Sequence, residues 1–153
     1  MTKKNWENRF KSDKETISNL YEEYKFLTEK MDEIKIEKFD SIRKGIDSAN
    51  WKSSLFNLSK YLYKYYGKKV VILIDEYDQS IIDSYIKGYY EEAIDFFKSF
   101  YGMILKDNEY LEMGVVTGIL RVVKENIFSG LNNLKVYTIS NNLARKGRYI
   151  IKA

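Results

Sequence analysis

The stretch Lys69-Val-Val-Ile-Leu-Ile-Asp-Glu-Tyr-Asp78 decides the fold, because it turns from apolar to acidic within one residue. Five uninterrupted apolar residues, mostly β-branched, run from Val70 to Ile74. A short run of this kind predicts a strand that is buried on both faces of a parallel sheet. Asp75 and Glu76 then fall at the carboxyl end of that strand, where open α/β sheets bind their ligands.

The pattern downstream of this strand predicts the rest of a sheet. A helix is predicted over residues 89–105, and a second buried strand over 111–117. A third short strand is predicted over 136–139. Strand, helix and strand at this spacing favour an α/β fold with parallel pairing. The apolar side of the helix is formed by Ala93, Phe96, Phe97, Phe100 and Ile104.

The residues upstream of the strand predict helices. One helix is expected to begin at Ser12 or earlier and to run to Met31, and a third runs over residues 51–66, with Gly67 as its C-terminal cap. The second is predicted over residues 38–48, with Phe39, Ile42 and Ile46 facing inward.

We therefore expect one domain over residues 1–153. Its predicted parts are a helical segment over 6–66, an α/β segment over 67–140 and a basic tail over 141–153 with little pattern. A length of 153 residues is sufficient for one domain with its own core.

The amino-acid composition limits the catalytic and metal-binding groups that the chain can use. The chain has no Cys, which excludes disulfides, a thiolate nucleophile and a zinc ribbon. It has no His, which excludes Ser-His-Asp catalysis and every His-ligated metal site. The remaining chemistry must use carboxylates, Lys, Arg, Ser, Thr, Tyr and backbone amides.

Charge is unevenly distributed along the chain. The net charge is +4, but residues 1–69 and 114–153 are basic and residues 70–113 are acidic. Basic segments with many Tyr are one signature of nucleic-acid binding. Basic residues that alternate with Glu and Asp along helices are also typical of a solvated face, which we favour here. No stretch approaches a membrane span and no apolar signal core follows Met1, so we expect a cytoplasmic protein without membrane contact.

The acidic pair at the strand end resembles a Walker B motif of P-loop ATPases. In that motif the first carboxylate, here Asp75, holds Mg²⁺ through water beside the phosphates. The second, here Glu76, orients the attacking water. The alternative is that these residues only end a strand. Thr117, at the end of the second strand, fits the sensor position, where a polar residue hydrogen-bonds the water or the γ-phosphate. The alternative is that it only ends the strand and has no ligand. Arg121 is a candidate charge-sensing or finger residue, or a surface arginine.

Several segments together resemble the AAA-ATPase-like family of uncharacterised, mostly bacterial proteins. They are Lys69–Asp78, Phe97-Lys-Ser-Phe-Tyr101, Thr117-Gly-Ile-Leu-Arg121 and Ile127-Phe-Ser-Gly-Leu-Asn-Asn-Leu134. The resemblance covers residues 10–139 approximately. It implies a P-loop NTPase fold of the AAA or STAND kind that uses ATP and Mg²⁺, with Asp75, Glu76 and Thr117 in the roles above. It also implies that many relatives carry a restriction-endonuclease-like nuclease domain. We expect the loop Ser129–Asn133 to pack near the nucleotide or a neighbouring domain.

One part of an ATPase site has no counterpart in this sequence. A phosphate loop needs Gly-x-x-x-x-Gly-Lys-Ser/Thr, and no two of the eight glycines are five positions apart. We therefore expect a truncated, partial P-loop domain that is inactive alone and whose sensor strand has an open edge. Its partner would be a homologous ATPase chain or the missing N-terminal half. The alternative is a non-catalytic binding module that contacts such a chain or nucleic acid. Carboxylate-based hydrolysis without nucleotides is disfavoured, because no second acidic cluster shows the required pairing.

Overall fold

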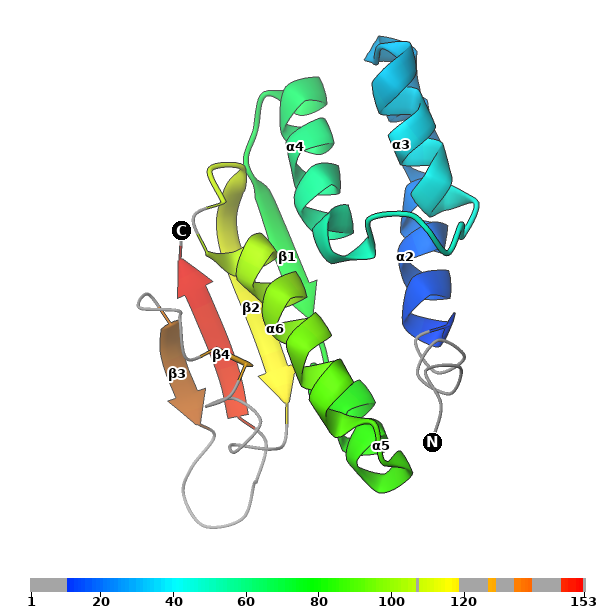
Figure 1. Ribbon diagram of the computed structural model, residues 1–153. Coiled ribbons are helices and arrows are strands. Elements are labelled where there is room, and N and C mark those ends of the chain that lie inside the picture. The colour runs from blue at the N-terminus through cyan, green and yellow to red at the C-terminus, as the bar shows by residue number, and fades with distance from the viewer. Residues whose placement is uncertain (1–10, 107, 119–126, 129–133, 139–146, 153) are drawn as a thin grey trace. The chain divides into compact units, whose positions relative to one another are not determined.

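The computed structural model describes residues 11–106, 108–118, 127–128, 134–138 and 147–152. The chain divides into two compact units, Met1–Lys68 and Lys69–Ala153. In the described residues, the first unit contains helices, and the second contains a four-stranded sheet with helices beside it (Figure 1). Helices combined with a sheet that has one parallel strand pair place the protein in the α/β class, as the sequence predicts. No described helix is long and apolar enough to cross a membrane.

From residue 11 to residue 68, where the helical unit is described, it contains three α-helices and two short 3₁₀ segments. These are α2 (Lys11–Glu23), η1 (Lys25–Lys30), α3 (Glu33–Arg43), η2 (Trp51–Ser53) and α4 (Ser54–Tyr66). The prediction of a single helix through Met31 is wrong, because the chain passes from α-helix to 3₁₀-helix at Tyr24. The predicted cap is confirmed, since Gly67 has the left-handed φ of 66° that glycine adopts without a steric penalty.

Helix α3 begins and ends earlier than predicted. Asp32 caps its start by accepting a hydrogen bond from the Lys35 backbone N–H at 3.0 Å. The helix ends at Arg43, so Ile46 lies beyond it and is 45% exposed. The prediction that Ile46 faces inward is therefore wrong, whereas Phe39 and Ile42 are buried as expected.

Aromatic rings form the centre of the helical core. Phe39 is fully buried, and its ring centroid lies 4.6 Å from that of Tyr21 and 6.0 Å from that of Tyr61. The Tyr21 hydroxyl donates to the Ser54 carbonyl at 2.6 Å, which links α2 to the start of α4. Other buried apolar side chains complete this core, namely Ile17, Leu27, Ile42, Trp51 and Leu58.

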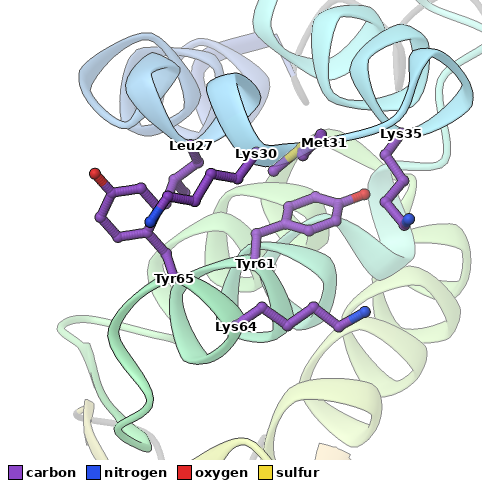
Figure 2. A pocket seen from close by; sticks show the side chains of 7 residues that line it. All are labelled: Leu27, Lys30, Met31, Lys35, Tyr61, Lys64 and Tyr65. Carbon is purple, nitrogen blue, oxygen red and sulfur yellow. The ribbon is translucent and has the colours of Figure 1, made fainter.

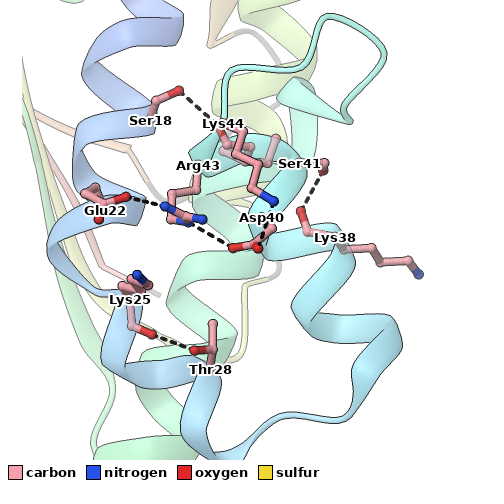
Figure 3. A network of polar contacts seen from close by, with 10 residues as sticks. Ser18, Glu22, Lys25, Thr28, Lys38, Asp40, Ser41, Arg43 and Lys44 are labelled. Atoms are coloured by element: carbon pink, nitrogen blue, oxygen red, sulfur yellow. Dashed lines mark hydrogen bonds and ion pairs between the residues drawn. The ribbon is translucent and has the colours of Figure 1, made fainter.

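An ion-pair network joins α2 to α3 on the surface of this unit (Figure 3). Arg43 donates to Glu22 at 2.6 Å and to Asp40 at 2.9 Å, and Lys44 lies 3.3 Å from Asp40. The hydrogen bond from Arg43 is the main cause that lowers the pKa of Glu22 and of Asp40. Both carboxylates are therefore more acidic in the folded chain than in the unfolded one.

The Arg43 network predicts a pH dependence of stability. A carboxylate with a lowered folded pKa stabilises the fold above its ordinary pKa, 4.5 for Glu22, and loses that contribution as the pH falls further. Arg43→Gln is expected to reduce stability at neutral pH and to flatten the decline on acidification. Thermal unfolding at neutral and acidic pH measures this. Lys11→Gln, which breaks an exposed 3.9 Å pair with Glu15, is the control. The prediction would be contradicted if acidification reduced the stability of Arg43→Gln as much as that of the unmodified chain.

The described residues of the sheet unit form four strands and two helices. These are β1 (Val70–Ile74), α5 (Gln79–Lys87), α6 (Tyr90–Leu105), β2 (Leu111–Gly118), β3 (Leu134–Thr138) and β4 (Gly147–Lys152). The strand order is β1-β2-β4-β3. The predicted parallel pairing of β1 and β2 is confirmed, and α6 matches the predicted helix with its five apolar residues buried or nearly so. Helix α5 was not predicted.

The expectation that β1 is buried on both faces is wrong. Val71 is 52% exposed and Leu73 is 74% exposed, whereas Val70, Ile72 and Ile74 are half-buried. Successive side chains of a strand point to opposite faces of the sheet. Among the described residues of this unit, helix α6 lies across one face of the sheet (Figure 1), so one set of alternate side chains stays exposed.

The second half of the sheet also differs from the predictions. Strand β4 lies in the basic tail, which carries no strand pattern, and it pairs antiparallel with both β2 and β3. The pairing with β2 runs from Met113 opposite Lys152 to Gly118 opposite Gly147. The predicted open edge beside Thr117 is therefore wrong, because β4 occupies it.

Candidate functional site

The candidate site lies where the two parallel strands of the sheet unit end. In the parallel register Ile74 is opposite Val116, so Asp75 and Thr117 follow on neighbouring strands at the same level. Parallel strands place their carboxyl ends at one edge of a sheet, which explains how residues 42 positions apart come together. The juxtaposition of Asp75 and Thr117 agrees with the predicted adjacency of their strands.

A hydrogen bond joins Asp75 and Thr117 directly, and further bonds join both residues to the turn that follows β1. The Thr117 hydroxyl donates to Asp75 Oδ1. The Glu76 backbone N–H lies 3.1 Å from the same Asp75 oxygen and 3.3 Å from Thr117 Oγ1, and the Tyr77 N–H donates to the Thr117 carbonyl at 3.0 Å. Thr117 therefore fixes both the carboxylate and the turn that follows it.

The turn after β1 is unusual at Glu76. Its φ is 52°, which is in the left-handed region, and no other non-glycine residue among those described has a positive φ. This conformation costs a side chain of this kind about 1–3 kcal/mol and occurs preferentially at functional sites. The Glu76 side chain is exposed, as is that of Asp75. A carboxylate at this position is therefore open to solvent above the strand ends.

Tyr77 and Gly118, which were not predicted to belong to the site, pack against each other next to this turn. Tyr77 is 2% exposed, and its ring lies directly against the backbone of Gly118. A Cβ at Gly118 would lie 2.5 Å from Tyr77 Cδ1 and 3.0 Å from Asp78 Oδ1. Gly118, which directly follows Thr117, is the sequence signal that could have revealed this close approach.

Aromatic contacts hold Tyr77 in place. The Tyr101 hydroxyl donates to the Tyr77 carbonyl at 3.3 Å, which connects α6 to the turn. The Phe128 ring centroid lies 5.1 Å from that of Tyr77 and 5.7 Å from that of Tyr101. Ile127 and Phe128, from the segment that carries the family resemblance, are both buried.

Two predictions from the sequence concern residues that the structure does not describe. Arg121 and the loop Ser129–Asn133 lie outside the described residues, so their predicted roles stay predictions. Register alone places Arg148 of β4 opposite Thr117 of β2.

The donor set at the strand ends fits one hard cation held partly through water. Asp75 Oδ1 accepts the two bonds above, and Oδ2 has no partner among the described residues. Oxygen ligands are those that Mg²⁺ prefers, and it commonly retains several waters beside one or two carboxylates. No cluster of three acidic side chains able to enclose a metal ion occurs in the described part of the chain. Asp75 is therefore suited to a water-mediated contact rather than to an all-protein cage.

The fold defines an α/β protein, and comparison with known proteins identifies its family. A family model described as "Predicted AAA-ATPase" matches residues 1–128. The chain therefore belongs to the AAA-ATPase-like family, which confirms the resemblance drawn from the sequence. The match includes Asp75, Glu76 and Thr117.

One curated relative is similar over part of the chain. An uncharacterized protein in the vnfD 5′ region of Azotobacter chroococcum mcd 1 is 33% identical over 69 residues. These residues are 44% of this chain and 13% of that protein, so the chain spans a small part of the relative's length. No solved structure matches the chain.

Proposed function

We propose that this chain supplies the magnesium-associated and water-orienting half of an ATPase site. The observation that carries the proposal is the hydrogen bond from Thr117 to Asp75 across two parallel strand ends. In this assignment the Asp75–Thr117 pair is the Walker B and sensor pair of a P-loop ATPase. The family match supports an ATPase-like domain, and the strand-end geometry supports these particular residues.

Each residue has a distinct part in this proposal. Asp75, oriented by Thr117 and by the Glu76 N–H, would hold Mg²⁺ through water with its second oxygen. Bound Mg–ATP would supply the reactive γ-phosphate and charge neutralisation. Glu76, exposed at the strained turn, would accept a proton from water and orient it. The Thr117 hydroxyl, whose proton goes to Asp75, can still accept a hydrogen bond from that water.

A phosphate loop has to come from outside these 153 residues. Without its backbone amides and lysine, most of the binding energy for the phosphates is missing. We propose that the chain alone binds ATP weakly, that it does not hydrolyse it, and that a homologous ATPase chain supplies the loop.

Magnesium titration tests the assignment of Asp75. In the unmodified chain, millimolar Mg²⁺ with ATP is expected to shift the backbone amide resonances of Glu76 and Thr117. Asp75→Asn keeps an acceptor for Thr117 but removes the charge, so these shifts are expected to disappear. Glu112→Gln, an exposed carboxylate at the start of β2, is the matched control and should retain them. Equal shifts in Asp75→Asn would exclude Asp75 as the magnesium-associated residue.

Phosphate release from ATP tests the proposed inactivity of the chain alone and the proposed role of Glu76. The chain alone is expected to release no phosphate from Mg–ATP above background. Hydrolysis that disappears in Glu76→Gln would contradict the predicted inactivity while supporting Glu76 as the water-orienting residue. Hydrolysis by the purified chain that Glu76→Gln leaves unchanged would contradict the role of Glu76.

A further inference from the structure

The helical unit contains a pocket that is separate from the strand-end residues. Its cavity of about 150 Å³ lies between η1, the start of α3 and α4, entirely within residues 1–68 (Figure 2). The floor is apolar and includes Leu27, while two tyrosines and three lysines complete the lining. We call it the Lys–Tyr pocket, and its polar residues are Lys30, Lys35, Tyr61, Lys64 and Tyr65.

Tyr61 is the most informative residue of the Lys–Tyr pocket. It is only 8% exposed, yet its hydroxyl has no hydrogen-bond partner among the described residues. The hydroxyls of the comparably buried Tyr21 and Tyr101 donate to backbone carbonyls. No buried side-chain oxygen or nitrogen among the described residues lacks a partner, so the Tyr61 hydroxyl itself reaches solvent although the rest of the side chain is buried. The Tyr61 hydroxyl, which faces the cavity in Figure 2, is therefore available to a ligand.

Three lysines line the pocket, and one carboxylate, that of Asp32, also acts on this hydroxyl. Lys64 has no partner among the described residues, whereas Lys35 is paired with the exposed Asp32. Figure 2 shows the ammonium groups of Lys35 and Lys64 on the same side of the pocket as the Tyr61 hydroxyl. Burial, and then the charge of Asp32, raise the pKa of Tyr61, so this hydroxyl keeps its proton and acts as a donor.

The other end of the pocket is aromatic. The Lys30 ammonium lies 4.4 Å from the centroid of the Tyr65 ring, a cation–π contact. Tyr66, whose ring centroid is 4.9 Å from that of Tyr65, is 56% exposed. A flat group can therefore stack on tyrosine beside the pocket while a smaller anionic group occupies the cavity.

We propose that the Lys–Tyr pocket binds a phosphate group, with the Tyr61 hydroxyl as hydrogen-bond donor and Lys35 and Lys64 as counter-charges. Lysines neutralise phosphate as point charges, and the tetrahedral anion accepts donors from several directions at once. The cavity is smaller than the roughly 300–1,000 Å³ of pockets for whole drug-sized ligands. It therefore holds one phosphate of a free phosphorylated molecule or of a single-stranded nucleic acid, whose bases would stack on Tyr66.

The test uses the full chain with two probes, inorganic phosphate and a short fluorescent oligothymidylate. Calorimetry measures binding of the first, and fluorescence anisotropy at fixed salt measures binding of the second. Tyr61→Phe keeps the ring and removes only the donor, so affinity is expected to fall about tenfold. Lys64→Gln, at an exposed position, is expected to cause a fall of about fivefold without affecting folding. Lys38→Gln, exposed on α3 and outside the pocket, should leave affinity unchanged.

The outcomes separate the two sources of phosphate. Oligonucleotide binding that inorganic phosphate displaces and that Tyr61→Phe weakens supports the proposal with nucleic acid as the source. Phosphate binding without oligonucleotide binding supports it with a free phosphorylated molecule as the source. The proposal is overturned if neither probe binds, if acetate competes as well as phosphate, or if Tyr61→Phe and Lys64→Gln bind like the unmodified chain.

Discussion

Gly118→Ala is expected to lower the free energy of unfolding of the sheet unit by about 3 kcal/mol, the upper end of the usual cost of overpacking. The added methyl group would lie 2.5 Å from Tyr77 Cδ1, and Tyr77 is 2% exposed. The ring cannot move freely, because Tyr101 and Phe128 pack against it. Displacement of Tyr77 would also disturb its hydrogen bond to the Thr117 carbonyl, and with it the turn at Glu76.

A second glycine provides a matched control for this substitution. Gly102 lies in the interior of α6, and a Cβ there would meet nothing within 4 Å. Gly102→Ala is therefore expected to be neutral or to stabilise by up to about 1 kcal/mol through helix propensity. Urea unfolding followed by circular dichroism compares the two variants. A Gly118→Ala chain as stable as the Gly102→Ala chain would show that Tyr77 can be displaced at little cost.

Phe39→Ala is expected to destabilise the helical unit by about 3–5 kcal/mol, the usual cost of removing a buried Phe side chain. Phe39 is fully buried, and its ring contacts those of Tyr21 and Tyr61. Removal would leave a cavity between α2, α3 and α4, because a close-packed core relaxes only partly around a lost ring.

Tryptophan fluorescence isolates this effect, because both tryptophans lie within residues 1–68. Trp51 is buried, and its indole N–H donates to the Ile46 carbonyl at 3.1 Å. The matched control is Ile34→Ala on the same helix, where the side chain is 67% exposed and the expected change is below about 0.5 kcal/mol. A similar shift of the urea midpoint in both variants would mean that Phe39 is not central to this core.

The candidate site could be predicted because its signals are local. Five apolar residues followed by Asp75 and Glu76 identify a strand and its end, and Thr117 marks the end of the next one. Parallel pairing then brings Asp75 and Thr117 together with no further information. The left-handed φ of Glu76 has no local signal, because Glu is not a residue type that favours this conformation.

The remaining parts of the fold depend on contacts that are distant in sequence. Strand β4 carries no alternating pattern strong enough to separate it from a basic tail, and its place between β2 and β3 is set by pairing alone. The exposure of Leu73 depends on which face α6 covers, and a uniformly apolar run does not encode that choice. The early start of α3, in contrast, follows from the local Asp32 cap, which the periodicity that favoured residues 38–48 does not include.

The position of β4 has a consequence for the order of events during synthesis. Thr117 is next to β4 in the sheet, but Gly147 follows it by 30 positions in the chain. At about 5–20 residues per second, a ribosome needs about 2–6 seconds to cover that distance. During this interval β1 and β2 can already pair while the far edge of β2 still presents unpaired amides and carbonyls. The candidate site of the nascent protein therefore acquires its neighbouring strand late, after its own residues are in place.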